Sequence, residues 1–142
     1  MNTSIRHTGL VVNDLEYSIK FWVEIMGFEI IKKINEKGDI VSNLIGLKNT
    51  DVITVKMKSK NNTILELLKF NSHKDILKNK LPYNLGFTHI ALNVQNIDKI
   101  MKKISAFGIK NNNFPQISED GSVKVVYARG PEGIFIELVE EL

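Results

Sequence analysis

Residues 7–30 read HTGLVVNDLEYSIKFWVEIMGFEI, and residues 89–110 read HIALNVQNIDKIMKKISAFGIK. Both stretches open on a histidine, continue with an apolar segment, and reach a glycine at a similar distance, Gly27 after twenty residues and Gly108 after nineteen. Self-similarity of this kind indicates an internal repeat. The sequence therefore predicts two copies of one structural unit.

Each copy closes on a similar apolar segment that holds one glutamate, TILELLKF at 63–70 and IFIELVEE at 134–141. Apolar periodicity and turn residues predict the elements between these landmarks. The first half is expected to form a strand at 4–12, a helix at 15–26, a strand at 28–35, a short helix at 40–47 and a hairpin of 52–58 with 63–70. The second half is expected to form a strand at 87–94, a helix from Ile97 to Gly108, and strands at 114–117, 123–129 and 134–140.

The two halves thus share the order strand, helix and three strands, which is typical of an α+β domain. We predict two tandem βαβββ modules, at about 1–70 and 86–142, joined by a linker at 71–85 with a helical turn at 73–79. Together they are expected to form a single domain over 1–142, in which a curved mixed sheet surrounds a metal-binding cleft.

Composition restricts the classes of function. The chain has 142 residues, 43% of them hydrophobic, but no apolar run of about 20 residues that could cross a bilayer. Its N-terminus lacks a signal-peptide pattern, so we expect a cytoplasmic protein. Zero cysteines exclude disulfides, zinc-thiolate sites and thiol catalysis. A net charge of +3 without a basic, aromatic-interleaved stripe indicates no nucleic-acid partner, and we expect no membrane partner.

Four residues at matching places in the two halves carry the candidate chemistry: His7, Glu66, His89 and Glu137. A carboxylate within so apolar a strand is costly unless it is paired or bound to a metal. Two neutral imidazoles and two carboxylates balance the charge of a divalent cation and leave two positions of an octahedron open. Convergence of the two modules would therefore create a metal site.

Taken singly, a strand histidine or glutamate is more often an ordinary surface or core group. The repetition of the pair is what favours a ligand set. His73 has no counterpart in the repeat and is interpreted as a surface residue. Arg6 and Arg129 are either binders of an anionic group or exposed surface arginines. The segment 130–133, Gly-Pro-Glu-Gly, is interpreted as a turn.

The whole pattern resembles the vicinal oxygen chelate superfamily, which includes glyoxalase I, methylmalonyl-CoA epimerase, bleomycin-resistance proteins and extradiol dioxygenases. The resemblance rests on the stretches at 7–29 and 87–109 and on the closing RGPEGIFIELVE at 129–140, and it covers essentially the whole chain. Glyoxalase-like members are the most similar. The fold that this resemblance implies is a pair of βαβββ modules.

The resemblance implies that His7, Glu66, His89 and Glu137 bind one divalent metal ion, either nickel, cobalt, zinc, manganese or iron. It implies a lyase or isomerase that transfers a proton next to a carbonyl through a metal-bound enediolate. Glu137 is then the preferred base, and Glu66 is a ligand and second proton carrier. The expected partners are a small-molecule substrate and a second copy of the chain in a homodimer.

Two alternatives of the same fold stay open: an extradiol-type dioxygenase, and a small-molecule binding or drug-resistance protein. Two departures concern the substrate. Val11 stands where bacterial glyoxalase I has an arginine, four residues after the first histidine. Phe70 stands where an asparagine is expected after Glu66, with Asn71 next to it. The resemblance therefore does not carry glutathione over as the substrate.

Overall fold

The computed structural model describes residues 2–76 and 78–142, and the chain divides into two compact units, Met1–Ile76 and Leu77–Leu142. Unit 1 contains β1 (Thr8–Val11), α1 (Leu15–Lys20), a π-helical turn (Phe21–Ile25), β2 (Glu29–Lys37), α2 (Asp39–Ile45), β3 (Asp51–Lys58) and β4 (Ile64–Phe70). Unit 2 contains β5 (His89–Asn93), α3 (Ile97–Ala106), β6 (Gln116–Ile117), β7 (Val123–Arg129), a 3-10 turn (Pro131–Gly133) and β8 (Phe135–Glu141).

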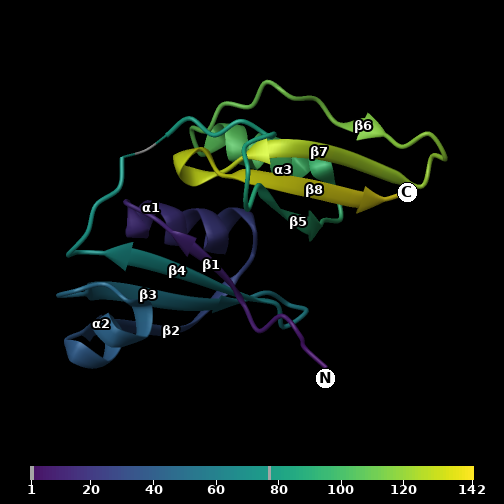
Figure 1. The fold of residues 1–142 in the computed structure, drawn as a ribbon. Coiled ribbons are helices and arrows are strands. Elements are labelled where there is room, and N and C mark those ends of the chain that lie inside the picture. Colours follow the sequence, from purple (N-terminus) through teal and green to yellow (C-terminus); the bar gives the residue numbers. More distant parts are fainter. Residues whose placement is uncertain (1, 77) are drawn as a thin grey trace. The chain divides into compact units, whose positions relative to one another are not determined.

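Each unit holds one four-stranded sheet, and the two sheets have the same topology (Figure 1). The strand order is β1-β4-β3-β2 in unit 1 and β5-β8-β7-β6 in unit 2. In each unit the first strand pairs in parallel with the last, β1 with β4 and β5 with β8. The other strand pairs are antiparallel. The α+β class and the repeated βαβββ order are thereby confirmed. The cleft between the two modules stays a prediction.

The two main helices, α1 and α3, begin at equivalent N-capping residues. Asp14 accepts a hydrogen bond from the backbone N–H of Tyr17 at 3.0 Å, and Asn96 accepts one from the N–H of Lys99 at 2.8 Å. These side chains satisfy N–H groups that have no partner within the helix. After each helical segment a glycine adopts positive φ, +73° at Gly27 and +96° at Gly108, a conformation that glycine adopts without steric cost.

The predicted helix at 15–26 is not a regular α-helix. It changes after Lys20 into a π-helical turn, in which the N–H of Met26 donates to the carbonyl of Phe21 at 3.3 Å. Phe21 and Trp22 are neighbours in sequence and both are buried. A regular α-helix separates consecutive side chains by about 100°, whereas the wider turn brings both rings to the core, where their centroids lie 5.6 Å apart.

Each unit buries one face of its sheet against its main helix. In unit 1, α1 packs on β4, and in unit 2, α3 packs on β7 and β8 (Figure 1). The fully buried side chains include Trp22, Phe21, Met57, Leu67, Ile97, Ile104, Ile136 and Leu138. In the part of the chain that the structure describes, no helix is both long enough and apolar enough to cross a membrane.

Three predicted elements differ in detail. β1 begins at Thr8, so His7 lies one residue before the strand in which it was expected. The predicted helix at 40–47 is present as α2, but Ile40 and Leu44 are 88% and 80% exposed and Val41 is its buried residue. The expected helical turn at 73–79 includes Leu77, which lies outside the described residues, and the described residues of that range are not helical.

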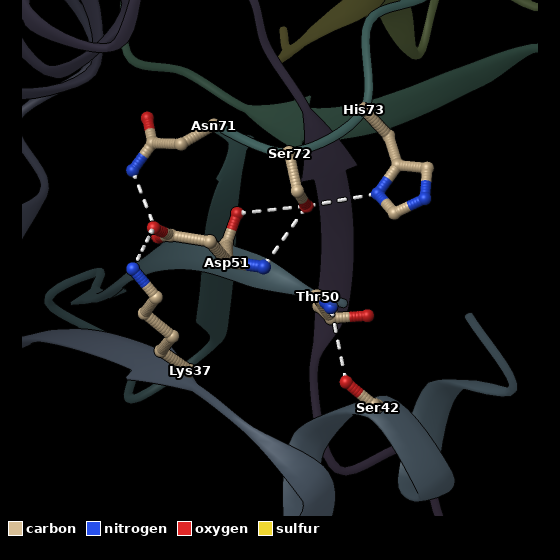
Figure 2. A network of polar contacts seen from close by, with 7 residues as sticks. All are labelled: Lys37, Ser42, Thr50, Asp51, Asn71, Ser72 and His73. Atoms are coloured by element: carbon tan, nitrogen blue, oxygen red, sulfur yellow. Dashed lines mark hydrogen bonds and ion pairs between the residues drawn. The ribbon is translucent and has the colours of Figure 1, made fainter. Parts of the chain in front are cut away.

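A polar network holds the chain at the end of unit 1 (Figure 2). Asn71 Nδ2 donates to Asp51 Oδ1 at 3.0 Å, and Lys37 Nζ lies 3.5 Å from Asp51 Oδ2. The backbone N–H of Asp51 donates to Ser72 Oγ at 2.9 Å, and Ser72 Oγ lies 2.8 Å from His73 Nδ1. Asn71 therefore ties β4 to the start of β3, and His73 is exposed, as the sequence predicted.

Candidate metal centre

In unit 1 the first histidine and the first glutamate are in contact. Glu66 lies on β4 between two buried leucines, Leu65 and Leu67, which face the helix-covered side of the sheet. On the other face, His7 Nε2 lies 3.1 Å from Glu66 Oε2. The two side chains are 32% and 13% exposed, so the pair is accessible at one side and screened at the other.

Unit 2 repeats this arrangement. His89 Nε2 lies 3.1 Å from Glu137 Oε2, and the two side chains are 28% and 24% exposed. Glu137 lies on β8 between two buried residues, Ile136 and Leu138. The structure thus brings each predicted histidine together with the predicted glutamate of its own unit.

The equivalence of the two pairs originates in strand register. Glu66 is paired with Gly9, two residues after His7, and Glu137 is paired with Ala91, two residues after His89. Side chains two residues apart on neighbouring parallel strands share a face and come within reach of each other. The parallel pairing of first and last strands is therefore what creates a histidine–glutamate pair in each unit.

The 3.1 Å separation fits a shared metal ion. Two nitrogen or oxygen ligands that bind an ion at about 2.1 Å, at a right angle to each other, lie about 3 Å apart. Among residues 2–76 and 78–142, no group of three or more histidine, aspartate or glutamate side chains that could hold a metal ion is present. The binding of one ion by all four residues stays a prediction.

Two residues that the sequence reasoning missed surround His89. Thr88 Oγ1 lies 2.8 Å from His89 Nδ1. The Tyr127 hydroxyl lies 3.2 Å from His89 Nε2, and the two ring centroids are 4.7 Å apart. Metal-binding histidines commonly donate their second ring N–H to an oxygen acceptor. Thr88 supplies such an acceptor, so Nε2 is the ring nitrogen left to face Glu137.

Unit 1 has a lysine where unit 2 has this tyrosine. Lys56 is directly opposite Glu66 in the β3–β4 register, and Tyr127 is directly opposite Glu137 in the β7–β8 register. Lys56 Nζ lies 4.0 Å from Glu66 Oε1. Both residues stand ten positions before their glutamate. That shared spacing is the sequence signal that could have identified them.

The two arginines considered as anion binders differ. Arg6 is exposed. Arg129 donates from Nη1 to the carbonyl of Gly133 at 2.7 Å and from Nη2 to the carbonyl of Lys80 at 3.0 Å, and its guanidinium lies 3.7 Å from the centroid of Phe135. These contacts give Arg129 a structural role, because they tie the chain that precedes β5 to the turn before β8.

The chain is similar in sequence to several known proteins. The probable lactoylglutathione lyase of Vibrio parahaemolyticus is 29% identical over 141 residues, which cover 98% of this chain and 91% of that protein. The probable lactoylglutathione lyase of Synechocystis is 28% identical and covers 94% of this chain and 92% of that protein. The lactoylglutathione lyase of Schizosaccharomyces pombe is 26% identical, and the chain spans 47% of its length.

Solved structures share the fold. A glyoxalase family protein from Bacillus cereus has a TM-score of 0.88 at 24% identity, with 99% of this chain and 97% of that chain covered. Glyoxalase I from Leishmania major has a TM-score of 0.62 at 22% identity, with 99% and 88% covered.

The family model described as Glyoxalase/Bleomycin resistance protein/Dioxygenase superfamily matches residues 4–138. This range contains both histidine–glutamate pairs and every strand through most of β8. The resemblance stated from the sequence is thereby confirmed, and the chain belongs to the Glyoxalase/Bleomycin resistance protein/Dioxygenase superfamily.

Proposed function

We propose that this protein is a divalent-metal-dependent lyase or isomerase of the glyoxalase type, which transfers a proton next to a carbonyl group. The observation that carries the proposal is the occurrence of the same histidine–glutamate pair in both units, with the same 3.1 Å separation. Relatives named lactoylglutathione lyase support a lyase at the level of the family.

The four side chains fit a divalent ion by donor type, and the 3.1 Å separation within each pair is compatible with two ligands of one ion. His7 and His89 would hold it through Nε2, and Glu66 and Glu137 would hold it through carboxylate oxygens. Nitrogen and oxygen donors without thiolate suit nickel, cobalt, zinc, manganese or iron. A bound ion would supply Lewis-acid stabilisation of negative charge on two neighbouring substrate oxygens.

The remaining chemistry belongs to the carboxylates. A positioned carboxylate can accept a proton from carbon and return it to the neighbouring carbon. We assign this step to Glu137, and we assign to Glu66 the roles of ligand and second proton carrier. On β4 and on β8, the buried neighbours of each glutamate fix it on the opposite face of its own sheet. Each carboxylate is therefore oriented by a strand and not by a flexible loop.

The substrate that we propose is a small hydroxy-carbonyl compound or a thioester, and the assembly is a homodimer. We propose that each ion takes one pair from each unit, either from the same chain or from two chains of the dimer. Glutathione is left open as part of the substrate, because Val11 replaces the arginine expected there and Asn71 is engaged with Asp51 at 3.0 Å.

The decisive experiment combines elemental analysis with turnover of a hemithioacetal of methylglyoxal. We expect one bound divalent ion in the wild type, loss of that ion in His7→Ala, and loss of turnover in Glu137→Gln. His73→Ala is the matched control, since His73 is exposed and lacks a counterpart in the repeat, and it should keep both properties.

Unchanged metal content in His7→Ala would refute the proposed site. Oxygen uptake with catechols under ferrous iron would instead identify the chain as an extradiol-type dioxygenase, because the proposed isomerisation consumes no oxygen. Tight capture of a small molecule by metal-free protein, without turnover, would indicate a binding protein.

A further inference from the structure

Two lysines stand side by side next to Glu66. The row that crosses the sheet at this level runs from Gly9 on β1 through Glu66 on β4 and Lys56 on β3 to Lys32 on β2. Directly opposite residues of antiparallel strands project from the same face, with Cβ atoms about 5 Å apart. Lys32 and Lys56 therefore share the face that carries the His7–Glu66 pair.

A β-bulge is what places Lys32 in this row. The register of β2 with β3 shifts between Ile30 and Lys32, so that Ile31 is the additional residue and Lys32 pairs with Lys56. In an unbroken register Ile31 would have been opposite Lys56, and Lys32 would have projected from the other face. Bulges of this kind commonly re-aim a side chain beside a functional site.

The lysine pair does not stabilise the fold. Like charges that are directly opposite in a sheet are destabilising. Two residues further along β3 the pairing is favourable, since Lys58 is opposite Glu29. Among residues 2–76 and 78–142, by contrast, Lys32 has no ion-pair partner, and Lys56 reaches a carboxylate only at 4.0 Å. Lys32 is exposed, and the carboxylate near Lys56 is that of Glu66, which also contacts His7. The two lysines therefore carry more positive charge than this carboxylate balances, and they are accessible to an anionic ligand.

Unit 2 carries no such charge at the equivalent place. The residue opposite Glu137 is Tyr127, whose hydroxyl contacts His89. Tyr127 also lies near the ring of Phe135, with the two centroids 6.4 Å apart. The lysines are thus a property of the first half alone and not of the repeated scaffold. Such a difference between two otherwise matched halves is expected when they contact different parts of one substrate.

We propose that Lys32 and Lys56 bind an anionic group of the substrate, a carboxylate or a phosphate, while its reacting oxygens lie at the histidine–glutamate site. This inference rests on the proposed function for the placement of the reacting oxygens, but the lysine pair itself is a binding site that can be tested alone. The anionic group would lie about one strand spacing, roughly 5 Å, from Glu66. The substrate class is therefore an anionic hydroxy-carbonyl compound or an anionic thioester.

The first test measures anion binding to metal-free protein at constant ionic strength. Succinate and inorganic phosphate are titrated separately, and the side-chain resonances of labelled lysines are followed by NMR. We expect saturable shifts at Lys32 and Lys56, and about a tenfold loss of affinity in Lys32→Gln and in Lys56→Gln, the size expected from loss of one charge-assisted contact. The anion that saturates at the lower concentration identifies the carboxylate or the phosphate as the preferred group.

The matched control is Lys60→Gln, which removes the same charge from the exposed β3–β4 turn and should keep the affinity of the wild type. The proposal is overturned if the wild type binds neither anion, or if Lys60→Gln loses as much affinity as the other two variants. This readout does not depend on turnover, so it can fail while the proposed function stands, and it can succeed while the proposed function fails.

The second test separates substrate binding from the chemical step. Hemithioacetals of methylglyoxal are compared for a thiol that carries a carboxylate and for neutral 2-mercaptoethanol. In Lys56→Gln we expect KM to rise about tenfold for the anionic compound with little change in kcat, and we expect no change of KM for the neutral one. An equal rise of KM for both compounds would show that Lys56 supports the site as a whole and would overturn its role in anion recognition.

Discussion

Thr88 gives His89 a defined orientation, and its contribution can be measured. When Nε2 is a metal ligand, Nδ1 carries the proton and donates it to Thr88 Oγ1 across 2.8 Å. Removing such an acceptor typically lowers metal affinity by about 10–100-fold. We therefore expect Thr88→Val to weaken divalent-metal binding by that factor in isothermal titration calorimetry, and Thr88→Ser, which keeps the hydroxyl, to restore most of it. Equal affinity in wild type and Thr88→Val would contradict this role.

The ligand-type residues of the candidate site could be read from the sequence because they are repeated. His7 and Glu66 match His89 and Glu137 in residue type and position, and the structure places each pair at 3.1 Å. Their neighbours could not be read in this way. Lys56 and Tyr127 occupy the same position relative to their glutamates but differ in residue type. A search for identical residues in the two halves therefore misses them. Their shared position, ten residues before a glutamate, is the signal that marks them in the sequence, and strand register shows that each is directly opposite that glutamate.

At the scale of elements, the β6–β7 turn contains one carboxyl group with an unusual pKa. Hydrogen bonds from the hydroxyl of Ser118, then from the backbone N–H and hydroxyl of Ser122, lower the pKa of Asp120 from 3.8 to about 2. Since the pKa is lower in the folded state, the stabilisation is present above about pH 4 and is lost as the pH falls towards 2.

Carboxyl carbon NMR can check this value. We expect the Asp120 signal to titrate with a midpoint near 2, and we expect the midpoint to move towards 3.8 in Ser118→Ala/Ser122→Ala. A wild-type midpoint near 3.8 would mean that the hydroxyls do not hold the carboxylate in solution.

The elements themselves were predictable wherever local patterns decide them. Apolar periodicity and turn residues predicted the main helices and the long strands. Two features depended on packing instead. The adjacent aromatic residues Phe21 and Trp22 are both buried, and they lie in a π-helical turn that the apolar spacing did not predict. The apolar spacing of Ile40 and Leu44 is helical, yet both are exposed, because periodicity identifies a helix and not the side that the sheet covers.

The buried residue Leu67 and the exposed residue Ile40 should differ in their contribution to the free energy of unfolding. Leu67 is completely buried at the centre of the unit 1 sheet, whereas Ile40 is 88% exposed on α2. Leu67→Ala should lower the free energy of unfolding by about 2–5 kcal/mol, through lost burial and the cavity left behind. Ile40→Ala should change it by less than about 0.5 kcal/mol. Urea denaturation of the two variants checks the comparison, and similar losses would show that α2 is covered by a partner in solution.

For the whole molecule, the repeat supplies the same histidine–glutamate pair twice. Each unit carries one imidazole and one carboxylate on or next to equivalent strands. The residues opposite the glutamates then differ, a lysine in one unit and a tyrosine in the other. If the four residues bind one ion as proposed, matching ligands with different neighbours would suit a substrate whose two reacting oxygens are similar and whose two ends differ.

Metal stoichiometry tests whether the two pairs act together. If each ion takes one pair from each unit, the protein binds one ion per chain, whether the pairs come from the same chain or from two chains of a dimer. His7→Ala and His89→Ala should then each abolish binding. If each pair held its own ion, the wild type would bind two per chain and either variant would keep one. Mixing His7→Ala with His89→Ala distinguishes the remaining arrangements, because only a site shared between chains regains an intact set of four ligands in the mixed dimer.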